Sequence, residues 1–271
     1  MVMRAKLAAR LVIAAILLEA AAGENVVLET FPAKASQGVA VDNDHFYAIS
    51  NTTIAKHDKV TGKLVAEWRA DRGGDATAHF KHMNSGTVFG GKLYCAHSRF
   101  PVDPNDNTVE VFGLAGETLQ HEATIPMPRI HGSLTWIDRR GDGTWWLCFA
   151  AYGKPDNAKT KLLRCRMEEG KFIAERSWFF PEETVARWGA MSCSGGSWGP
   201  DGLLYVTGHD QAEACVLEID GEGVLSHIRT EPVPGISGQA IAWDRFCGKP
   251  HLWGIVKGKQ VSVVLVPANA G

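Results

Sequence analysis

The sequence contains no Cys-x-x-C pair, which excludes the zinc ribbons and thioredoxin-type redox sites that need this spacing. It also has no excess of basic residues, because 28 Lys and Arg stand against 30 Asp and Glu in 271 residues, a formal net charge of -2. Proteins that grip nucleic acid on a broad surface carry clustered positive charge. We therefore expect no nucleic-acid partner.

Long apolar runs are also missing, since none approaches the roughly 20 residues that a membrane-spanning helix needs. The run Leu11–Leu18 is short, is preceded by three basic residues and is followed by Ala20–Ala22. This order of a basic segment, an apolar core and small residues is typical of a cleaved secretory signal, whereas a membrane anchor would be longer. We predict that residues 1–22 are such a signal. The protein is then secreted or periplasmic, with no membrane contact after cleavage.

Charged residues are sparse at 21%, and 29 Gly outnumber 12 Pro, which favours a fold with many turns and strands. Export would permit disulfides, and six cysteines allow fifteen pairings. Four cysteines lie in apolar, strand-like runs, where this residue usually acts as a small buried hydrophobic group. These four are Cys95, Cys148, Cys165 and Cys215. We expect most of the six to be free buried thiols.

A pattern recurs five times in the rest of the chain. In each unit a glycine starts an apolar run, and these glycines are Gly38, Gly86, Gly132, Gly195 and Gly238. Shortly afterwards comes a pair that ends in Tyr or Trp: Phe46-Tyr47, Leu93-Tyr94, Trp145-Trp146, Leu204-Tyr205 and Leu252-Trp253. Several apolar runs end in an acidic residue, such as Asp42 and Asp138. Further β-rich stretches follow, separated by turns rich in Asp, Gly and Lys.

Four strands in about 40 to 50 residues are typical of one β-propeller blade. Five such units account for nearly all of the chain after residue 22, so we predict an all-β fold, a single five-bladed β-propeller over residues 23–271. The last unit supplies only three strands. We expect the N-terminal strand Val26–Phe31 to complete its blade and leave no open edge. One or two helical turns are expected in Pro181–Trp188, and we expect a monomer.

The topology of a propeller predicts which of these residues lie close together in space. The innermost strand of each blade lines the central channel and the second strand runs back beside it. The loops that lead into the first strands and out of the second strands therefore meet at one face. Four of the ten histidines lie in or near these loops: His82, His97, His131 and His209. Gln37 and His131 directly precede two of the five glycines, so we expect both at the mouth of the channel.

Imidazoles from separate elements suit a divalent transition metal. We predict that these four histidines, His82, His97, His131 and His209, hold such a metal, whose open coordination position would supply a Lewis acid or an activated water. The alternative is that they are hydrogen-bonded loop residues with no common partner. No local motif such as His-Glu-x-x-His supports the metal, so this prediction rests on topology alone.

Further residues on the same face complete the predicted site. We predict catalytic roles for His131, His209 and Asp210, with Asp210 or a metal-bound hydroxide as the base. Guanidinium groups there would orient an anionic or carbohydrate-derived small-molecule substrate. The residues predicted to bind substrate are Arg99, Arg129, Gln37 and Gln239.

The repeated strand pairs resemble the β-propeller superfamily over the whole chain after residue 22. Examples are GVAVDNDHFYAIS at 38–50 and SGGSWGPDGLLYVTGHD at 194–210. They are similar to gluconolactonase-like propellers and to the five-bladed plant-type glutaminyl cyclases. Gluconolactonase-like propellers are usually six-bladed, hold calcium or zinc with carboxylates and Asn, and hydrolyse lactones or esters. This sequence has more His than Glu at the expected channel mouth. The resemblance therefore implies the fold, and no catalytic residue is carried over.

Three hypotheses about function follow from the sequence. The first is an exported metal-dependent hydrolase, lyase or cyclase that acts on a lactone or carbohydrate-type substrate. The second is a non-catalytic propeller that binds a ligand or a protein. The third is a metal-free enzyme with a histidine base.

Overall fold

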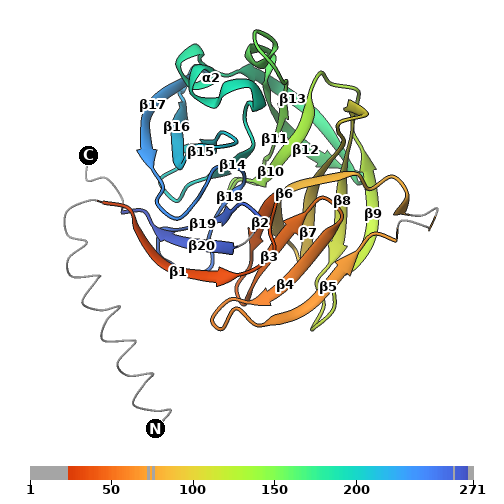
Figure 1. Ribbon diagram of the computed structural model, residues 1–271. Coiled ribbons are helices and arrows are strands. Elements are labelled where there is room, and N and C mark those ends of the chain that lie inside the picture. Colours follow the sequence, from red (N-terminus) through yellow and green to blue (C-terminus); the bar gives the residue numbers. More distant parts are fainter. Residues whose placement is uncertain (1–23, 72–73, 75–76, 259, 268–271) are drawn as a thin grey trace.

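The computed structural model describes residues 24–71, 74, 77–258 and 260–267. These residues form five four-stranded antiparallel sheets arranged around a central axis (Figure 1). The predicted five-bladed, all-β propeller is confirmed. The predicted signal, residues 1–22, lies outside the described residues.

We number the blades 1 to 5 in chain order. The innermost strands are β2 (Gly38–Val41), β6 (His82–Phe89), β10 (Ser133–Arg139), β14 (Gly195–Trp198) and β18 (Ile241–Trp243). The second strands are β3 (His45–Ser50), β7 (Lys92–Arg99), β11 (Trp145–Ala150), β15 (Leu204–Thr207) and β19 (His251–Val256). The third strands are β4 (Thr53–Asp58), β8 (Asp103–Gly113), β12 (Lys161–Glu168), β16 (Glu213–Ile219) and β20 (Gln260–Leu265). The outermost strands are β5 (Leu64–Arg69), β9 (Gln120–Pro126), β13 (Lys171–Phe179), β17 (Leu225–Pro232) and β1 (Val26–Pro32).

The N-terminal strand closes the ring, as predicted. β1 pairs antiparallel with β20, in a register that runs from Val26 opposite Leu265 to Pro32 opposite Gln260. Its buried end places Phe31 5.2 Å from the ring of Phe46 in blade 1 and 5.9 Å from that of Trp253 in blade 5. The strand therefore covers the edge of blade 5 and also packs against its neighbour.

The core lies between the blades because alternate residues of each inner strand face opposite neighbours. Val39 packs in a cluster with Trp253 of blade 5, whereas the next residue, Ala40, packs with Met83 of blade 2. Close approach of two inner strands explains a glycine: a Cβ on Gly38 would lie 2.6 Å from the carbonyl oxygen of Asn84. Inner strands are thus held by side-chain packing on both faces.

One inner strand begins earlier than its glycine indicates. β6 starts at His82, four residues before Gly86. It pairs with β7 on both sides of an irregularity between Met83 and Gly86, and His82 and Met83 form the pairs on the N-terminal side. His82, expected in a loop, is therefore a strand residue opposite Ser98.

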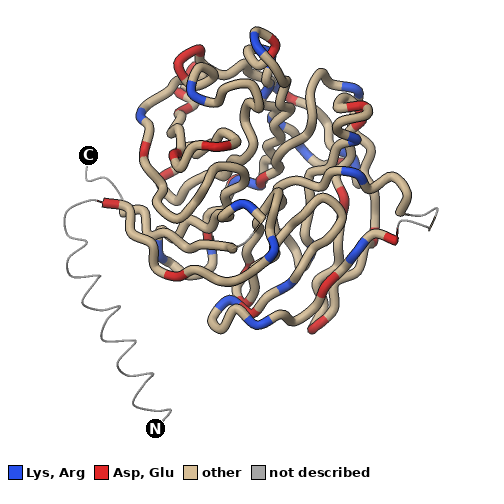
Figure 2. The backbone as a smooth tube through the Cα atoms, viewed as in Figure 1, with Lys and Arg blue, Asp and Glu red and all other residues tan. Residues whose placement is uncertain are grey.

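Helices are short in the described part of the chain. α2 (Glu182–Trp188) confirms the expected helical turns, and η3 (Asp156–Lys159) and η4 (Gly189–Met191) lie beside it. No helix among the described residues is long and apolar enough to cross a membrane. The six cysteines are free thiols, and Cys247 alone among them is not buried. Basic and acidic residues are interspersed around the ring (Figure 2).

Candidate functional site

We call the end of the channel where the inner strands begin the upper face, and the end where they finish the lower face. His97 of β7 lies near the upper face but is only 1% exposed. Its Nε2 accepts a hydrogen bond from the Lys81 backbone N–H at 3.1 Å, so the proton must be on Nδ1, which lies 2.8 Å from Thr108 Oγ1. Burial lowers the pKa of His97 to about 4. This neutral imidazole has no nitrogen left for a metal.

His97 belongs to a buried polar network built around Glu110 of β8. The Glu110 carboxylate is inaccessible to solvent and accepts hydrogen bonds from His121 at 2.8 Å and Thr124 at 2.7 Å. His79 Nε2 lies 3.2 Å from its other oxygen, which also accepts from the Thr108 hydroxyl. Burial opposes the charged form, but these hydrogen bonds lower the pKa of Glu110. This network pairs the charged Glu110 carboxylate with hydrogen-bond donors and so stabilises the interior of blade 2.

The other predicted metal ligands make separate contacts. His82 packs against Phe100 with ring centroids 5.2 Å apart, and burial lowers its pKa to about 4. His131 Nε2 lies 2.6 Å from Asp156 Oδ2 in an exposed pair. His209 pairs with Asp210, as described below. The structure therefore does not bring the four histidines together, because each imidazole finds a partner in its own blade or in a neighbouring loop.

His209, Asp210 and Lys257 form a polar cluster on the upper face between blades 4 and 5. His209 Nδ1 lies 2.6 Å from Asp210 Oδ1, and Lys257 Nζ lies 3.0 Å from the same oxygen and 2.9 Å from Nδ1. Nδ1 cannot both donate to the carboxylate and accept from the ammonium. Since two acceptors at 2.6 Å would repel each other, Nδ1 carries the proton and donates to Asp210. The hydrogen bond from Lys257, with that from His209, lowers the pKa of Asp210 despite partial burial.

This arrangement leaves the other ring nitrogen of His209, Nε2, with a lone pair. The His209 side chain is 22% exposed, and it is therefore partly open to solvent. The adjacent backbone is tightly fitted, because a Cβ on Gly238 would lie 2.6 Å from the His209 carbonyl. Sequence reasoning had placed His209 and Asp210 on this face, and the structure joins them directly.

The residues predicted to bind substrate have varied surroundings. Gln239 is buried beside His209 and has a left-handed backbone with φ of 68°, which is costly for a residue with a side chain. Gln37 donates its backbone N–H to the Ile49 carbonyl at 3.0 Å, at the start of blade 1. Arg99 pairs with Asp106 at 3.1 Å, and Arg129 lies 2.9 Å from a carboxylate oxygen of Asp103. The two guanidinium groups are thus engaged by carboxylates of their own face.

The lower face holds an ion pair that sequence reasoning missed. Asp138, at the end of β10, is buried and receives a two-pronged contact from Arg245 of blade 5 at 2.9 and 2.5 Å. Its carboxylate also accepts from the hydroxyls of Thr87 and Ser197, each at 3.1 Å, and from the Trp198 N–H at 2.8 Å. These donors come from blades 2, 4 and 5, so Asp138 links four blades across the end of the channel.

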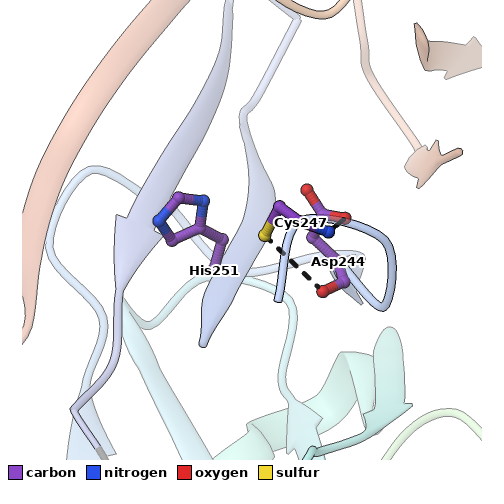
Figure 3. Close-up of side chains that lie close together, drawn as sticks. All are labelled: Asp244, Cys247 and His251. Atoms are coloured by element: carbon purple, nitrogen blue, oxygen red, sulfur yellow. Dashed lines mark hydrogen bonds between the residues drawn. The ribbon is translucent and has the colours of Figure 1, made fainter. Parts of the chain in front are cut away.

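A second cluster lies at the hairpin of β18 and β19, with two residues in the turn and His251 at the start of β19. Ligand atoms of Asp244, Cys247 and His251 lie within 4.8 Å of one another, and among the described residues no other set of three His, Cys, Asp or Glu side chains does so (Figure 3). Such a donor set suits a transition metal. However, Lys59 Nζ already lies 2.6 Å from Asp244 Oδ2, and Asp244 Oδ1 accepts the Phe246 N–H at 3.0 Å. This is a metal-binding candidate whose carboxylate is occupied by an ammonium.

Comparisons with known proteins support the fold. No protein-family model and no curated protein sequence matches the chain. Among solved structures, the chain is similar to the glutaminyl cyclase of Myxococcus xanthus, with 13% identity, a TM-score of 0.60, and coverage of 90% of this chain and 97% of that one. It is also similar to a putative glucose dehydrogenase of Thermus thermophilus, with 14% identity, a TM-score of 0.53, and coverage of 88% and 100%.

A putative gluconolactonase matches with 12% identity, a TM-score of 0.47, and coverage of 81% of this chain and 70% of that one. At 13% and 14% identity, the two matches with TM-scores above 0.5 show the propeller fold and no specific activity.

Proposed function

We propose that the protein is an exported hydrolase that opens a small lactone or a related carbohydrate-derived ester at the upper face, with His209 as general base. The observation that carries this proposal is the 2.6 Å contact between His209 Nδ1 and Asp210, which fixes the tautomer and leaves Nε2 basic. A carboxylate that orients an imidazole in this way also stabilises the imidazolium that forms when a proton is taken up.

The residues perform the reaction as follows. Nε2 of His209 takes a proton from water while the water oxygen forms a bond to the lactone carbonyl carbon. The ring C–O bond then breaks, and the imidazolium returns the proton to the departing alkoxide, so that the product is the hydroxy acid. Asp210 holds the imidazole throughout. Lys257, 3.0 Å from Asp210 and 2.9 Å from Nδ1, helps to hold the Asp210 carboxylate in place.

The test is hydrolysis of glucono-δ-lactone and a small panel of lactones, followed by proton release. His209→Gln is expected to lose at least about 100-fold in kcat/KM, because a positioned base contributes that much. Asp210→Asn should lower kcat with little change in KM. His227→Gln, which alters a histidine of β17 on an outer strand, is the matched control and should keep full activity. Absence of turnover by the wild-type protein, or full activity of His209→Gln, would overturn the proposal and favour a non-catalytic binding propeller.

A second candidate is a metal-dependent activity at Asp244, Cys247 and His251, favoured by the grouping of their ligand atoms. A bound transition metal would supply a Lewis acid or activate a water. Burial lowers the pKa of His251, so its imidazole is neutral and ready to ligate. Burial raises the pKa of the Cys247 thiol, which opposes the thiolate that a metal needs. Lys59 competes for the third ligand, Asp244.

Zinc titration of protein purified without chelator tests this second candidate. We expect weak binding by the wild type and at least about tenfold tighter binding by Lys59→Met, because an ammonium close to the ion costs on the order of 1–4 kcal/mol. His251→Gln in the Lys59→Met background should abolish the gain. Equal zinc affinity of Lys59→Met and the wild type would contradict a site at this group.

A further inference from the structure

The lower end of the channel opens into a cavity of about 200 Å³. Its walls are largely apolar, with Ile137 and Ile241 among them, and its polar lining includes the Asp138–Arg245 pair. A cavity of roughly 150 Å³ is enough to bind benzene when its lining is apolar. The hollow therefore has room for a small organic molecule, and it lies at the opposite face from His209.

Positive charge dominates this cavity. Three arginines line it, Arg139, Arg140 and Arg245, and Asp138 is the one acidic residue among the described lining residues. Arg245 is fully engaged by Asp138, in the two-pronged contact already described. Arg140 has a weak partner, with 3.9 Å between its Nε and Asp142 Oδ2. Two guanidinium groups are thus left without a close carboxylate among the residues that the structure describes.

Both guanidinium groups are held in place by aromatic rings. The Arg139 guanidinium lies 3.6 Å from the ring centroid of Phe89, and that of Arg140 lies 4.4 Å from a ring centroid of Trp198. Stacking fixes the plane of each group while leaving its N–H edges able to donate. Pre-positioned donors of this kind reduce the entropy cost of binding an anion.

Seven buried side-chain nitrogen or oxygen atoms of the described residues have no hydrogen-bond partner, and two of them belong to residues that line this cavity. Arg139 Nε is buried and has no hydrogen-bond partner among the described residues, and the same holds for the indole N–H of Trp243, another lining residue. Buried donors are nearly always paired in native proteins, because an unpaired one loses its hydration without compensation. An acceptor supplied by a ligand would remove this cost.

We infer that the lower end of the channel is a binding site for a small organic carboxylate, held by Arg139 and Arg140. The carboxylate oxygens accept hydrogen bonds from the two guanidinium groups. The body of the ligand occupies the apolar cavity, next to Phe89 and Phe246, two rings that are 43% and 46% exposed at its rim. This site is independent of the proposed hydrolase activity and does not require it.

Benzoate is the probe, and its binding is measured by isothermal titration calorimetry on the mature protein. We expect saturable binding of benzoate and at least about tenfold weaker binding of benzamide, which has the same shape without the charge. Arg139→Met and Arg140→Met should each weaken benzoate binding about 10- to 100-fold. Arg176→Met is the matched control, because Arg176 also stacks on a tryptophan, at 5.1 Å from Trp178, but lies outside the cavity lining.

The outcomes are decisive in both directions. Melting temperatures close to that of the wild type show that the variants fold, and Arg140→Met, which alters a side chain that is 38% exposed, covers the case in which Arg139→Met does not. Loss of binding in Arg140→Met but not in Arg176→Met supports the site. No saturable binding of benzoate, or equal binding by Arg140→Met, would overturn it, whatever the lactone assays show.

Discussion

Asp138→Ala is expected to lower the free energy of unfolding by about 3–5 kcal/mol, because its buried carboxylate accepts hydrogen bonds from the Arg245 guanidinium and from the Trp198 N–H, and that N–H is left buried without an acceptor. The hydroxyls of Thr87 and Ser197 lose their acceptor in the same step. For a protein of this size the melting temperature should fall by roughly 10 °C. Thermal unfolding followed by circular dichroism measures the change.

Two further variants sharpen this experiment. Asp138→Leu combined with Arg245→Met should be more stable than Asp138→Ala, since the leucine refills the space of the carboxylate and no guanidinium is left without its partner. Asp103→Ala, which removes a partly exposed carboxylate paired with the exposed Arg129, should change the melting temperature little. If Asp138→Ala melts within roughly 2 °C of the wild type, the link between blades is not a source of stability.

Acid is expected to destabilise the protein by about 3 kcal/mol between pH 7 and pH 4 through His97 alone. Burial lowers the pKa of this imidazole to about 4 in the folded protein, whereas in the unfolded chain it returns to its ordinary value of 6.5. As the pH falls below 6.5, the unfolded chain takes up a proton that the folded protein does not. The stability is therefore complete above pH 6.5 and is lost progressively down to about pH 4.

Glu110 continues this loss at lower pH. Its pKa is lowered in the folded protein by the hydrogen bonds from His121, Thr108 and Thr124, which outweigh burial, so its contribution disappears as the pH falls below the value of the unfolded chain. Urea unfolding at a series of pH values measures both effects. His97→Gln cannot protonate and should reduce the slope between pH 6.5 and 4 to the part that His82 contributes, while His227→Gln should leave it unchanged. An unaltered slope in His97→Gln would rule out His97 as its source.

The fold could be predicted because its signals are local and repeated. The recurring acidic residue after an inner strand has a physical reason: Asp42 accepts the hydroxyl of Tyr47 at 2.6 Å, and Asp201 that of Tyr205 at 2.8 Å. The acid and the aromatic pair of one hairpin are thus parts of one hydrogen-bonded unit. The fourth strand of blade 4, Leu225–Pro232, was not identified, because all seven positions after Leu225 are exposed or half-exposed and the strand has little apolar pattern.

The site was harder to predict because the topology of the fold indicates the face on which a residue lies, but not the direction in which its side chain points. His209 and Asp210 are neighbours in sequence, so their contact could be expected from the sequence. The burial of His97 depends on Lys81 and Thr108, whose positions are set by packing in blade 2. The Asp138–Arg245 pair joins residues 107 positions apart, and no spacing rule connects them. The one indication in the sequence was that Asp138 is the acidic residue that ends the apolar run of its repeat.

The pairing of β1 with β20 also has a consequence for the order of folding. Thr30 lies opposite Ser262, 232 residues away, so the last blade cannot assemble until almost the whole chain is present. Contacts of such long range carry a high entropic cost before they form and slow the folding of β-rich proteins. Four blades can collapse as local hairpins, but ring closure is a late event. Until then the chain exposes two unpaired strand edges, and this interval is when aggregation competes most strongly with folding.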